Sequence, residues 1–323
     1  MFSFFIVVQG PYVEGTANLI TCLRKIFPDT QIILSCYKEK IDKCVFETAE
    51  VRRNEDPGTI ITPPRNKPLN LKRQATTTLM GCRNATQPWV MKFRSDLEIV
   101  SEKKILQSFN LFVSLIERGE KLRLMTLNTG CLNIFSYYQM PFHFNDIFFV
   151  TRTSELRRNC EAAVRFNEQK LVDDFSVNIP ENYYHRDRYQ LKFHCEQIMH
   201  FGAQLISGHL LKYCCDMNHI SKMRHMLWTA KYLHLTNMKA IGIRSTKAGY
   251  PSINSHLVSI DRLCLALLKQ VAKNNGRKRN IAMLSLVAQG LVTKYIFLAN
   301  RTIFRLIVDL KKLIKKNSLS KSV

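Results

Sequence analysis

The sequence predicts an α/β protein in which a mostly parallel sheet is flanked by helices and followed by a helical C-terminal region. Strand-like and helix-like segments alternate through the first half of the chain, the pattern of a parallel sheet with helical connections. The first strand-like segment, residues 2–8, reads FSFFIVV and is apolar throughout, as expected for a strand buried on both faces. From about residue 205, strand signals fade and helical patterns rich in Lys and Arg dominate. We therefore expect a domain over residues 1–204 and a basic, mainly helical region over residues 205–323.

The individual elements follow in chain order. After the first strand, Glu14–Ile26 is expected to be a helix that ends before Pro28, because the residue before a proline disfavours helical geometry. An apolar run predicts a strand at Gln31–Ser35, a variable charged region continues to Arg53, and Ile60–Pro68 is expected to be a Pro-rich loop. The later predictions are a helix at Leu69–Arg83, a strand at Trp89–Phe93, a helix at Glu102–Glu117, strands at Leu122–Leu127 and Phe144–Val150, and a helix that begins at Thr153.

Charge is the strongest compositional signal, because 48 Lys and Arg against 25 Asp and Glu give a formal net charge of +23. Such an excess implies polyanionic surroundings: nucleic acid, anionic lipid or phosphate-bearing substrates. The chain has no helix-turn-helix, zinc-finger or RNP-type signature, so nucleic-acid binding is kept only as a less favoured alternative. An anionic membrane surface agrees better with the concentration of basic residues towards the C-terminus.

Cysteine usage and the absence of targeting signals predict the compartment. The ten cysteines are scattered and form no C-x-x-C pair, which argues against a zinc site and against a disulfide framework. The apolar N-terminus lacks the basic segment and the cleavage site of an export signal. No run reaches the ~18 apolar residues of a membrane span. We therefore expect a cytoplasmic protein with reduced thiols.

The clearest helical periodicity lies at Thr302–Lys316. Its apolar residues recur at i, i+3, i+4 and i+7 and form one stripe, with cations around the edges or opposite. One interpretation is a helix that packs its stripe on the domain. The other is an interfacial helix on the anionic inner leaflet of a membrane, where each nearby cation contributes about 1 kcal/mol.

The most informative segment for chemistry is Val90–Asp96, where an apolar strand ends abruptly in charged and hydroxyl side chains. In an open α/β sheet, ligands bind outside the carboxyl ends of the strands. Asp96 would then lie where a phosphate, a metal or a substrate binds, although a strand can also simply end at a solvated Asp. Three other segments favour the first interpretation: Val7–Pro11, Glu55–Gly58 and Asn70–Thr77.

Taken together and in this order, these segments resemble the WavE lipopolysaccharide-synthesis family. The resemblance runs from about Phe4 to Gly202 and includes His143–Phe149 and Pro180–Tyr183. It implies a glycosyltransferase with a GT-A-type fold that uses a nucleotide-sugar donor. The acceptor would be a saccharide or lipid-linked saccharide of lipopolysaccharide core, O-antigen or capsule. The protein would work as a peripheral protein at the cytosolic face of the membrane.

The resemblance places the base and ribose of the donor at Gln9, Gly10 and Pro11. Glycine permits a close approach of the backbone, proline fixes the turn, and the glutamine amide offers a donor and an acceptor to a base edge. Asp56 would lie near the same base or ribose. Without the resemblance, Gly10-Pro11 and the segment around Asp56 are ordinary turn sequences.

Asn70, Arg73 and Gln74 open the predicted helix at Leu69–Arg83 and match a further segment of the family. The positive end of a helix together with an arginine makes an anion site, which suits the diphosphate of the donor. The alternative is a capped helix start that faces solvent.

The metal-binding pattern of GT-A enzymes is changed in this chain. The usual Asp-x-Asp is replaced by Arg94, Ser95 and Asp96, so Asp96 is the candidate ligand for Mg²⁺ or Mn²⁺ without its first partner. Glu98 could add a second carboxylate only where the backbone leaves strand geometry. Lys92 and Arg94 are expected on the same side of the strand, where they would neutralise phosphate in place of a metal. They could also be solvated charges at the sheet edge.

The catalytic base of an inverting enzyme of this class would be an Asp or Glu near the acceptor hydroxyl. Asp146 matches the family segment best, and Glu181 and Glu196 are the alternatives. The missing first carboxylate also leaves open a non-catalytic scaffold of polysaccharide assembly with a nucleotide-sugar fold.

Overall fold

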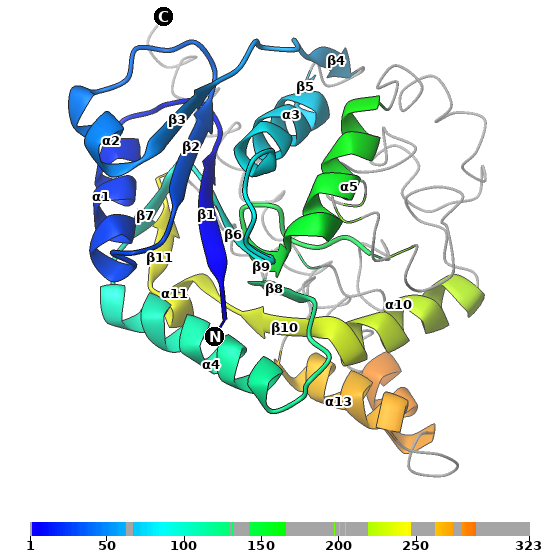
Figure 1. Ribbon diagram of the computed structural model, residues 1–323. Coiled ribbons are helices and arrows are strands. Elements are labelled where there is room, and N and C mark those ends of the chain that lie inside the picture. The colour runs from blue at the N-terminus through cyan, green and yellow to red at the C-terminus, as the bar shows by residue number, and fades with distance from the viewer. Residues whose placement is uncertain are drawn as a thin grey trace, which may run out of the picture.

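The computed structural model describes residues 2–62, 67–128, 131, 142–165, 197, 200, 204, 219–246, 262–273 and 280–288. Within them, a seven-stranded sheet lies at the centre and helices cover both of its faces (Figure 1). From edge to edge the strands are β10 (Leu233–Thr236), β8 (Leu124–Leu127), β9 (Phe148–Arg152), β6 (Trp89–Arg94), β1 (Phe4–Gln9), β2 (Ile32–Cys36) and β3 (Glu50–Arg53).

The sheet is mostly parallel, as the sequence predicts. Neighbouring strands are parallel throughout, except that β9 runs antiparallel to both β6 and β8. The central strand β1 is buried along nearly its whole length, which explains its uninterrupted apolar sequence. The predicted α/β class, a mostly parallel sheet with flanking helices, is therefore confirmed.

Two helical layers enclose the sheet. One face packs against helices α1 (Thr16–Ile26), α4 (Glu102–Glu117) and the short α11 (Met238–Ile241), with α2 (Lys43–Thr48) beside α1. The other face packs against α3 (Leu71–Cys82), α5 (Thr153–Arg165), α10 (His219–Tyr232) and α13 (Arg262–Lys273). Helix α3 comes very close to β1, because a Cβ on Gly81 would meet Val7 Cγ1 at 2.7 Å. Nearer its amino end, α3 lies beside the carboxyl end of β1, where Thr77 accepts a hydrogen bond from Gln9.

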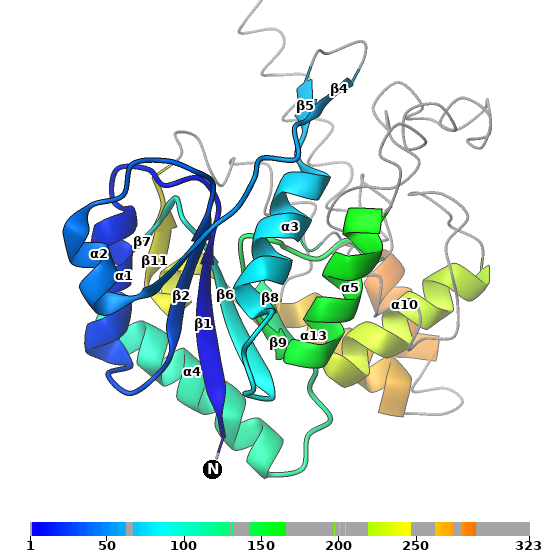
Figure 2. The same ribbon diagram turned by 45° about the horizontal axis from the view of Figure 1, so that its top comes forward.

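Two small antiparallel sheets complete the described fold. Strand β7 (Leu97–Ile99) follows β6 after a turn and pairs with β11 (Ile243–Ser245). Strands β4 (Ile60–Thr62) and β5 (Lys67–Leu69) form a second pair that stands at the amino end of α3 (Figure 2). The prediction of a loop over Ile60–Pro68 is therefore wrong for the five described residues of that range, all of which lie in these two strands.

The predicted strand Phe144–Val150 begins later in the structure, at Phe148. The Asn145 side-chain oxygen accepts hydrogen bonds from the N–H groups of Ile147 (2.8 Å) and Phe148 (3.4 Å). These bonds hold the segment before the strand in a turn, so the ladder with β6 starts only beyond it. An amide side chain competing with the backbone is a signal that apolar patterning does not report.

The chain beyond residue 205 is not purely helical. Strand β10 joins the main sheet beside β8, and β11 pairs with β7, so this mainly helical region also contributes two short strands. Both strands are only three or four residues long, too short for a clear alternating pattern. The domain boundary after residue 204 stays a prediction. The segment 302–316 lies outside the described residues, and none of the helices described here is long and apolar enough to cross a bilayer.

Candidate functional site

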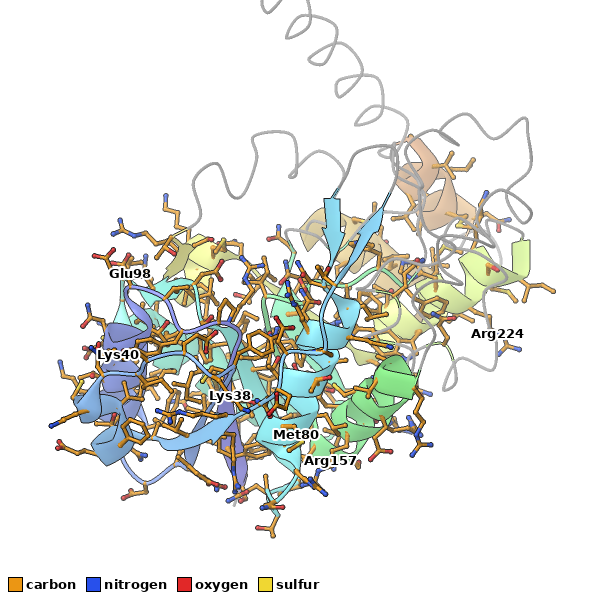
Figure 3. The ribbon with its side chains drawn as sticks, turned by 90° about the horizontal axis from the view of Figure 1, so that it is seen from above. Lys38, Lys40, Met80, Glu98, Arg157 and Arg224 are labelled. Atoms are coloured by element: carbon orange, nitrogen blue, oxygen red, sulfur yellow. The ribbon has the colours of Figure 1, made fainter. Side chains whose placement is uncertain are left out.

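A cavity of about 460 Å³ opens at the carboxyl ends of β1 and β6, beside the amino end of α3. Figure 3 looks down on this end of the molecule. Of the residues predicted to bind the donor, all but Lys92 line the cavity. The complete lining consists of Gln9, Gly10, Pro11, Val13, Tyr37, Asp56, Asn70, Arg73, Gln74, Arg94, Ser95 and Asp96. Five parts of the chain thus meet at one place, although the roles of these residues in binding stay predictions.

The turn after β1 requires glycine for a reason within the protein. Gly10 has a φ of +129°, and a Cβ there would meet Ser95 Oγ at 2.6 Å. The Ser95 N–H donates to the Gln9 carbonyl (2.9 Å), and the Thr16 hydroxyl donates to the Ser95 carbonyl (3.2 Å). The ends of β1 and β6 are thereby tied together, which fixes the floor of the cavity.

Arg73 and Asp56 form an ion pair on one wall of the cavity. Arg73 Nε lies 2.8 Å from Asp56 Oδ1, and Nη2 lies 2.6 Å from Oδ2. The bond from Arg73 lowers the pKa of the Asp56 carboxyl. The same carboxylate accepts a hydrogen bond from the Gly58 N–H at 2.9 Å. The predicted turn at residues 56–58 therefore also holds the Asp56 side chain in position.

Arg94 and Asp96 form a second ion pair that lines the cavity. Arg94 Nε lies 2.5 Å from Asp96 Oδ1 and Nη2 lies 2.8 Å from Oδ2, so the guanidinium engages both carboxylate oxygens. Nowhere in the described ranges do three or more His, Cys, Asp or Glu side chains gather in a way that could hold a metal ion. Glu98 is paired with Arg244 instead (2.6 Å). The described residues therefore do not fit the Mg²⁺ or Mn²⁺ site expected at Asp96.

Lys92 does not reach the cavity, which corrects the expectation that it contacts donor phosphates. Its side chain is 1% exposed, and its ammonium donates to the main-chain carbonyl of Asp146 and lies 5.5 Å from the Phe149 ring centre. Burial lowers the pKa of Lys92 to about 8. The side of the strand was predicted correctly, but Lys92 is buried against the Asp146 carbonyl and the Phe149 ring, whereas Arg94, at the end of β6, lines the cavity.

Asp146 lies in a tightly held segment at the same edge of the sheet. It is 8% exposed, and its neighbours are fixed by hydrogen bonds from Arg94 N to the Ile147 carbonyl (2.9 Å) and from the Thr126 hydroxyl to the Asn145 carbonyl (3.2 Å). It lines neither this cavity nor the neighbouring one described below. The alternative bases Glu181 and Glu196 lie outside the described residues.

A second, more open cavity of about 840 Å³ adjoins the first, and both are lined by Val13 and Asp96. It lies between α1 and β7, with Asn18, Glu98 and Thr246 among its polar lining residues. Asp96 therefore stands at the junction of two spaces large enough for two reactants.

The sequence analysis missed Tyr37 and Val13 in the first cavity. Tyr37 directly follows β2, so the rule that ligands bind beyond the carboxyl ends of parallel strands would have identified it. Burial raises the pKa of its hydroxyl. Val13 lies in the connection between β1 and α1 and carries no chemical signal by which sequence alone could single it out.

The family assignment rests on a match that covers most of the chain. The sequence profile of the WavE lipopolysaccharide synthesis family matches residues 4–247. The chain belongs to this family. The match includes both arginine–carboxylate pairs of the cavity, and it extends past residue 202 to β10 and β11, so the WavE region is longer than the resemblance indicated. Among curated proteins, none matches this WavE chain.

Several solved structures are similar to this WavE protein at low identity. A cytidylyltransferase from Leptospira borgpetersenii has 10% identity and a TM-score of 0.32 over 50% of this chain and 65% of that chain. Glucosyl-3-phosphoglycerate synthase from Mycobacterium tuberculosis, solved with Mn²⁺, UDP and glucosyl-3-phosphoglycerate, has 13% identity and a TM-score of 0.33 over 54% and 66%. TarS from S. aureus has 11% identity and a TM-score of 0.34 over 91% and 72%. The chain spans slightly less than two thirds of the first two proteins, and TM-scores of this size do not bear on function.

Proposed function

We propose that this WavE protein is a GT-A-like glycosyltransferase that moves a sugar from a nucleotide-sugar donor to a saccharide of lipopolysaccharide, O-antigen or capsule. The observation that carries the proposal is the cavity at the carboxyl ends of β1 and β6, which both Arg73 and Arg94 line. The family description, lipopolysaccharide synthesis, supports the reaction class.

The two arginines supply the charge that a departing nucleoside diphosphate needs. Negative charge grows on the diphosphate as the bond to the sugar breaks, and fixed cations placed at that point are usually the largest catalytic term. Arginine presents a planar fork that matches phosphate oxygens. The amino end of α3, whose N-cap Asn70 makes no capping side-chain hydrogen bond, adds a positive dipole end on the same wall.

The acceptor would enter the second cavity and meet the donor at Asp96. This cavity combines carboxylate, amide and hydroxyl side chains with an apolar base at Leu19 and Leu97, a surface that suits a polyhydroxylated sugar. The base that removes the proton of the acceptor hydroxyl would be one of the three carboxylates that the family resemblance implies, namely Asp146, Glu181 or Glu196. Such a base must come within hydrogen-bond reach of the acceptor, so Asp146, which lines neither cavity, would have to reach it by a movement of its segment.

A transfer assay tests the proposal. The full chain is incubated with UDP-, GDP-, CMP- and dTDP-sugars and truncated lipopolysaccharide, and both the released nucleotide and the mass of the acceptor are measured. We expect one donor class to give a heavier acceptor and Arg94→Gln to reduce the rate at least ~100-fold, with an unchanged melting temperature. Donor binding without turnover of any donor would indicate the non-catalytic scaffold instead, which the replacement of the first Asp by Arg94 would allow.

We further propose that the protein is peripheral on the inner face of an anionic membrane. The net charge of +23 and the apolar stripe with flanking cations at residues 302–316 support this proposal. Deleting the residues after Asn300 should abolish sedimentation with vesicles of anionic lipid while leaving transfer to a soluble acceptor within about threefold. Binding of the full chain should weaken steeply with salt, because added ions screen each charge. Failure of the full chain to bind these vesicles at low salt would refute this localisation.

A further inference from the structure

Two glutamine side chains in the wall of the first cavity carry buried acceptor oxygens without a donor. Gln9 lines the cavity, is 3% exposed, and has no hydrogen-bond partner for Oε1. Gln74 lines the same cavity from helix α3, and its Oε1 is likewise buried without a partner. An unsatisfied buried acceptor costs about 1–3 kcal/mol, so each such atom needs an explanation.

The orientation of the Gln9 amide is fixed by Thr77. The Thr77 hydroxyl donates its single proton to the main-chain carbonyls of Arg73 (2.7 Å) and Gln74 (3.3 Å). Thr77 Oγ1 can therefore only accept from Gln9, and it does so from Nε2 at 2.8 Å. An amide that turns its nitrogen towards Thr77 must turn its oxygen the other way. The protein thus presents an acceptor at the position of Gln9.

We propose that this pair of acceptors reads the base of the donor nucleotide and that the base is guanine. This inference rests on the proposed function and assigns the substrate class of the same cavity. Guanine carries two donors side by side on one edge, the ring N1–H and the exocyclic N2 amino group. Each can satisfy one of the two glutamine oxygens.

The other bases match the two acceptors less well. Uracil and thymine have one ring N–H flanked by two carbonyl oxygens, so an acceptor on the base would face an acceptor of the protein. Cytosine and adenine have an amino donor next to a ring nitrogen that carries a lone pair. A site built to hydrogen-bond a group of the substrate rejects analogues that lack it strongly, because its own polar atoms stay unpaired.

Binding of free diphosphates to the full chain tests the base. Calorimetry with GDP, IDP, UDP, CDP and ADP keeps the diphosphate constant while the base edge changes. We expect GDP to bind at least ~tenfold tighter than UDP, CDP and ADP. IDP, which keeps the ring N–H but lacks the amino group, should lie between. Equal or tighter binding of UDP or CDP would overturn the guanine assignment and leave the nucleotide-sugar function standing, whereas no binding of any diphosphate would refute both.

Thr77→Val tests whether the hydrogen bond from Gln9 Nε2 to Thr77 Oγ1 fixes the orientation of the Gln9 amide. Valine keeps the shape of threonine but cannot accept from Gln9, so the amide can turn its nitrogen towards the ligand. The preference for GDP over CDP should shrink at least ~tenfold in this variant. Thr76→Val, at the neighbouring and more exposed position of α3, is the matched control and should keep the wild-type preference. An unchanged preference in folded Thr77→Val would overturn the role of Thr77, and if that variant does not fold, the diphosphate series with the wild-type chain still decides the assignment.

Discussion

Lys92 and Arg94 lie two residues apart on the same side of β6, yet their surroundings differ completely. The Lys92 ammonium is buried beside the Phe149 ring and donates to a main-chain carbonyl of the protein itself. The Arg94 guanidinium lies at the end of the strand, pairs with Asp96 and lines an open cavity. The two residues represent two regions, a closed polar cluster around Asn145 and an open site between β1, β6 and α3.

The difference between the regions lies in how their polar groups are satisfied. In the closed cluster, Thr126, Asn145 and Lys92 bond to main-chain groups of the same sheet edge. In the open site, the acceptor oxygens of Gln9 and Gln74 have no donor. Buried polar groups that complete one another stabilise a structure, whereas groups arranged around a cavity with acceptors unfilled are typical of a place where a ligand binds.

The largest expected effect comes from Arg94→Gln. Removing the guanidinium from the open site should lower the rate of sugar transfer at least ~100-fold, because the leaving diphosphate loses a preorganised cation. The melting temperature should change little, since the Arg94 side chain lines the cavity, where it pairs with Asp96. Arg123→Gln, which removes an arginine from an ion pair with Glu155 away from the cavity, is the control. Transfer by Arg94→Gln within threefold of wild type would remove Arg94 from the site.

The closed cluster should reveal itself in the pH dependence of stability. Lys92 has a folded pKa of about 8 against an ordinary value of 10.5, so the unfolded chain binds more protons between these values and stability rises with pH there. At about 1.4 kcal/mol per pH unit, the gain across the window is roughly 3 kcal/mol. The free energy of unfolding of wild type minus that of Lys92→Met should rise by this amount from pH 8 to 10.5. If the difference in the free energy of unfolding did not change between these pH values, the pKa of Lys92 would not be lowered in the folded protein.

The contrast also shows what the sequence could and could not predict. Patterning predicted that Lys92 and Arg94 share one side of a strand and that Met91 and Phe93 share the other, which the two core clusters confirm. It could not predict that only Lys92 is buried, because that depends on contacts with Asp146 and Phe149, more than fifty positions away in the chain. Burial by such distant residues leaves no trace in the local sequence.

The sequence predicted which segments line the cavity, but not which of their side chains form ion pairs with each other. The rule about strand ends brought residues 9–11 and 94–96 together, and the family resemblance added 56 and 70–74. Only the structure shows that Arg94 pairs with the carboxylate of Asp96 and that Arg73 pairs with the carboxylate of Asp56. These pairs changed the expected chemistry, because an Asp96 whose two oxygens face a guanidinium is a poor ligand for a divalent metal.

The smallest expected effect sharpens the position of the phosphates within the open site. Arg73→Ala should weaken binding of a nucleoside diphosphate roughly tenfold, about 1.4 kcal/mol, and binding of the free nucleoside much less. The reason is that Arg73 would contact the diphosphate and not the base. Equal loss for both ligands in calorimetric titrations would place Arg73 away from the phosphates.

The central claim is that the donor diphosphate binds between Arg73 and Arg94, and one calorimetric series tests it most directly. The dissociation constant of the tightest-binding nucleoside diphosphate is measured for wild type, for the double variant Arg73→Gln/Arg94→Gln and for Arg123→Gln. We predict a loss of at least ~100-fold in the double variant, since two charge-assisted contacts disappear, and a change below about threefold in the control. A folded double variant that binds the diphosphate as tightly as wild type would contradict the account.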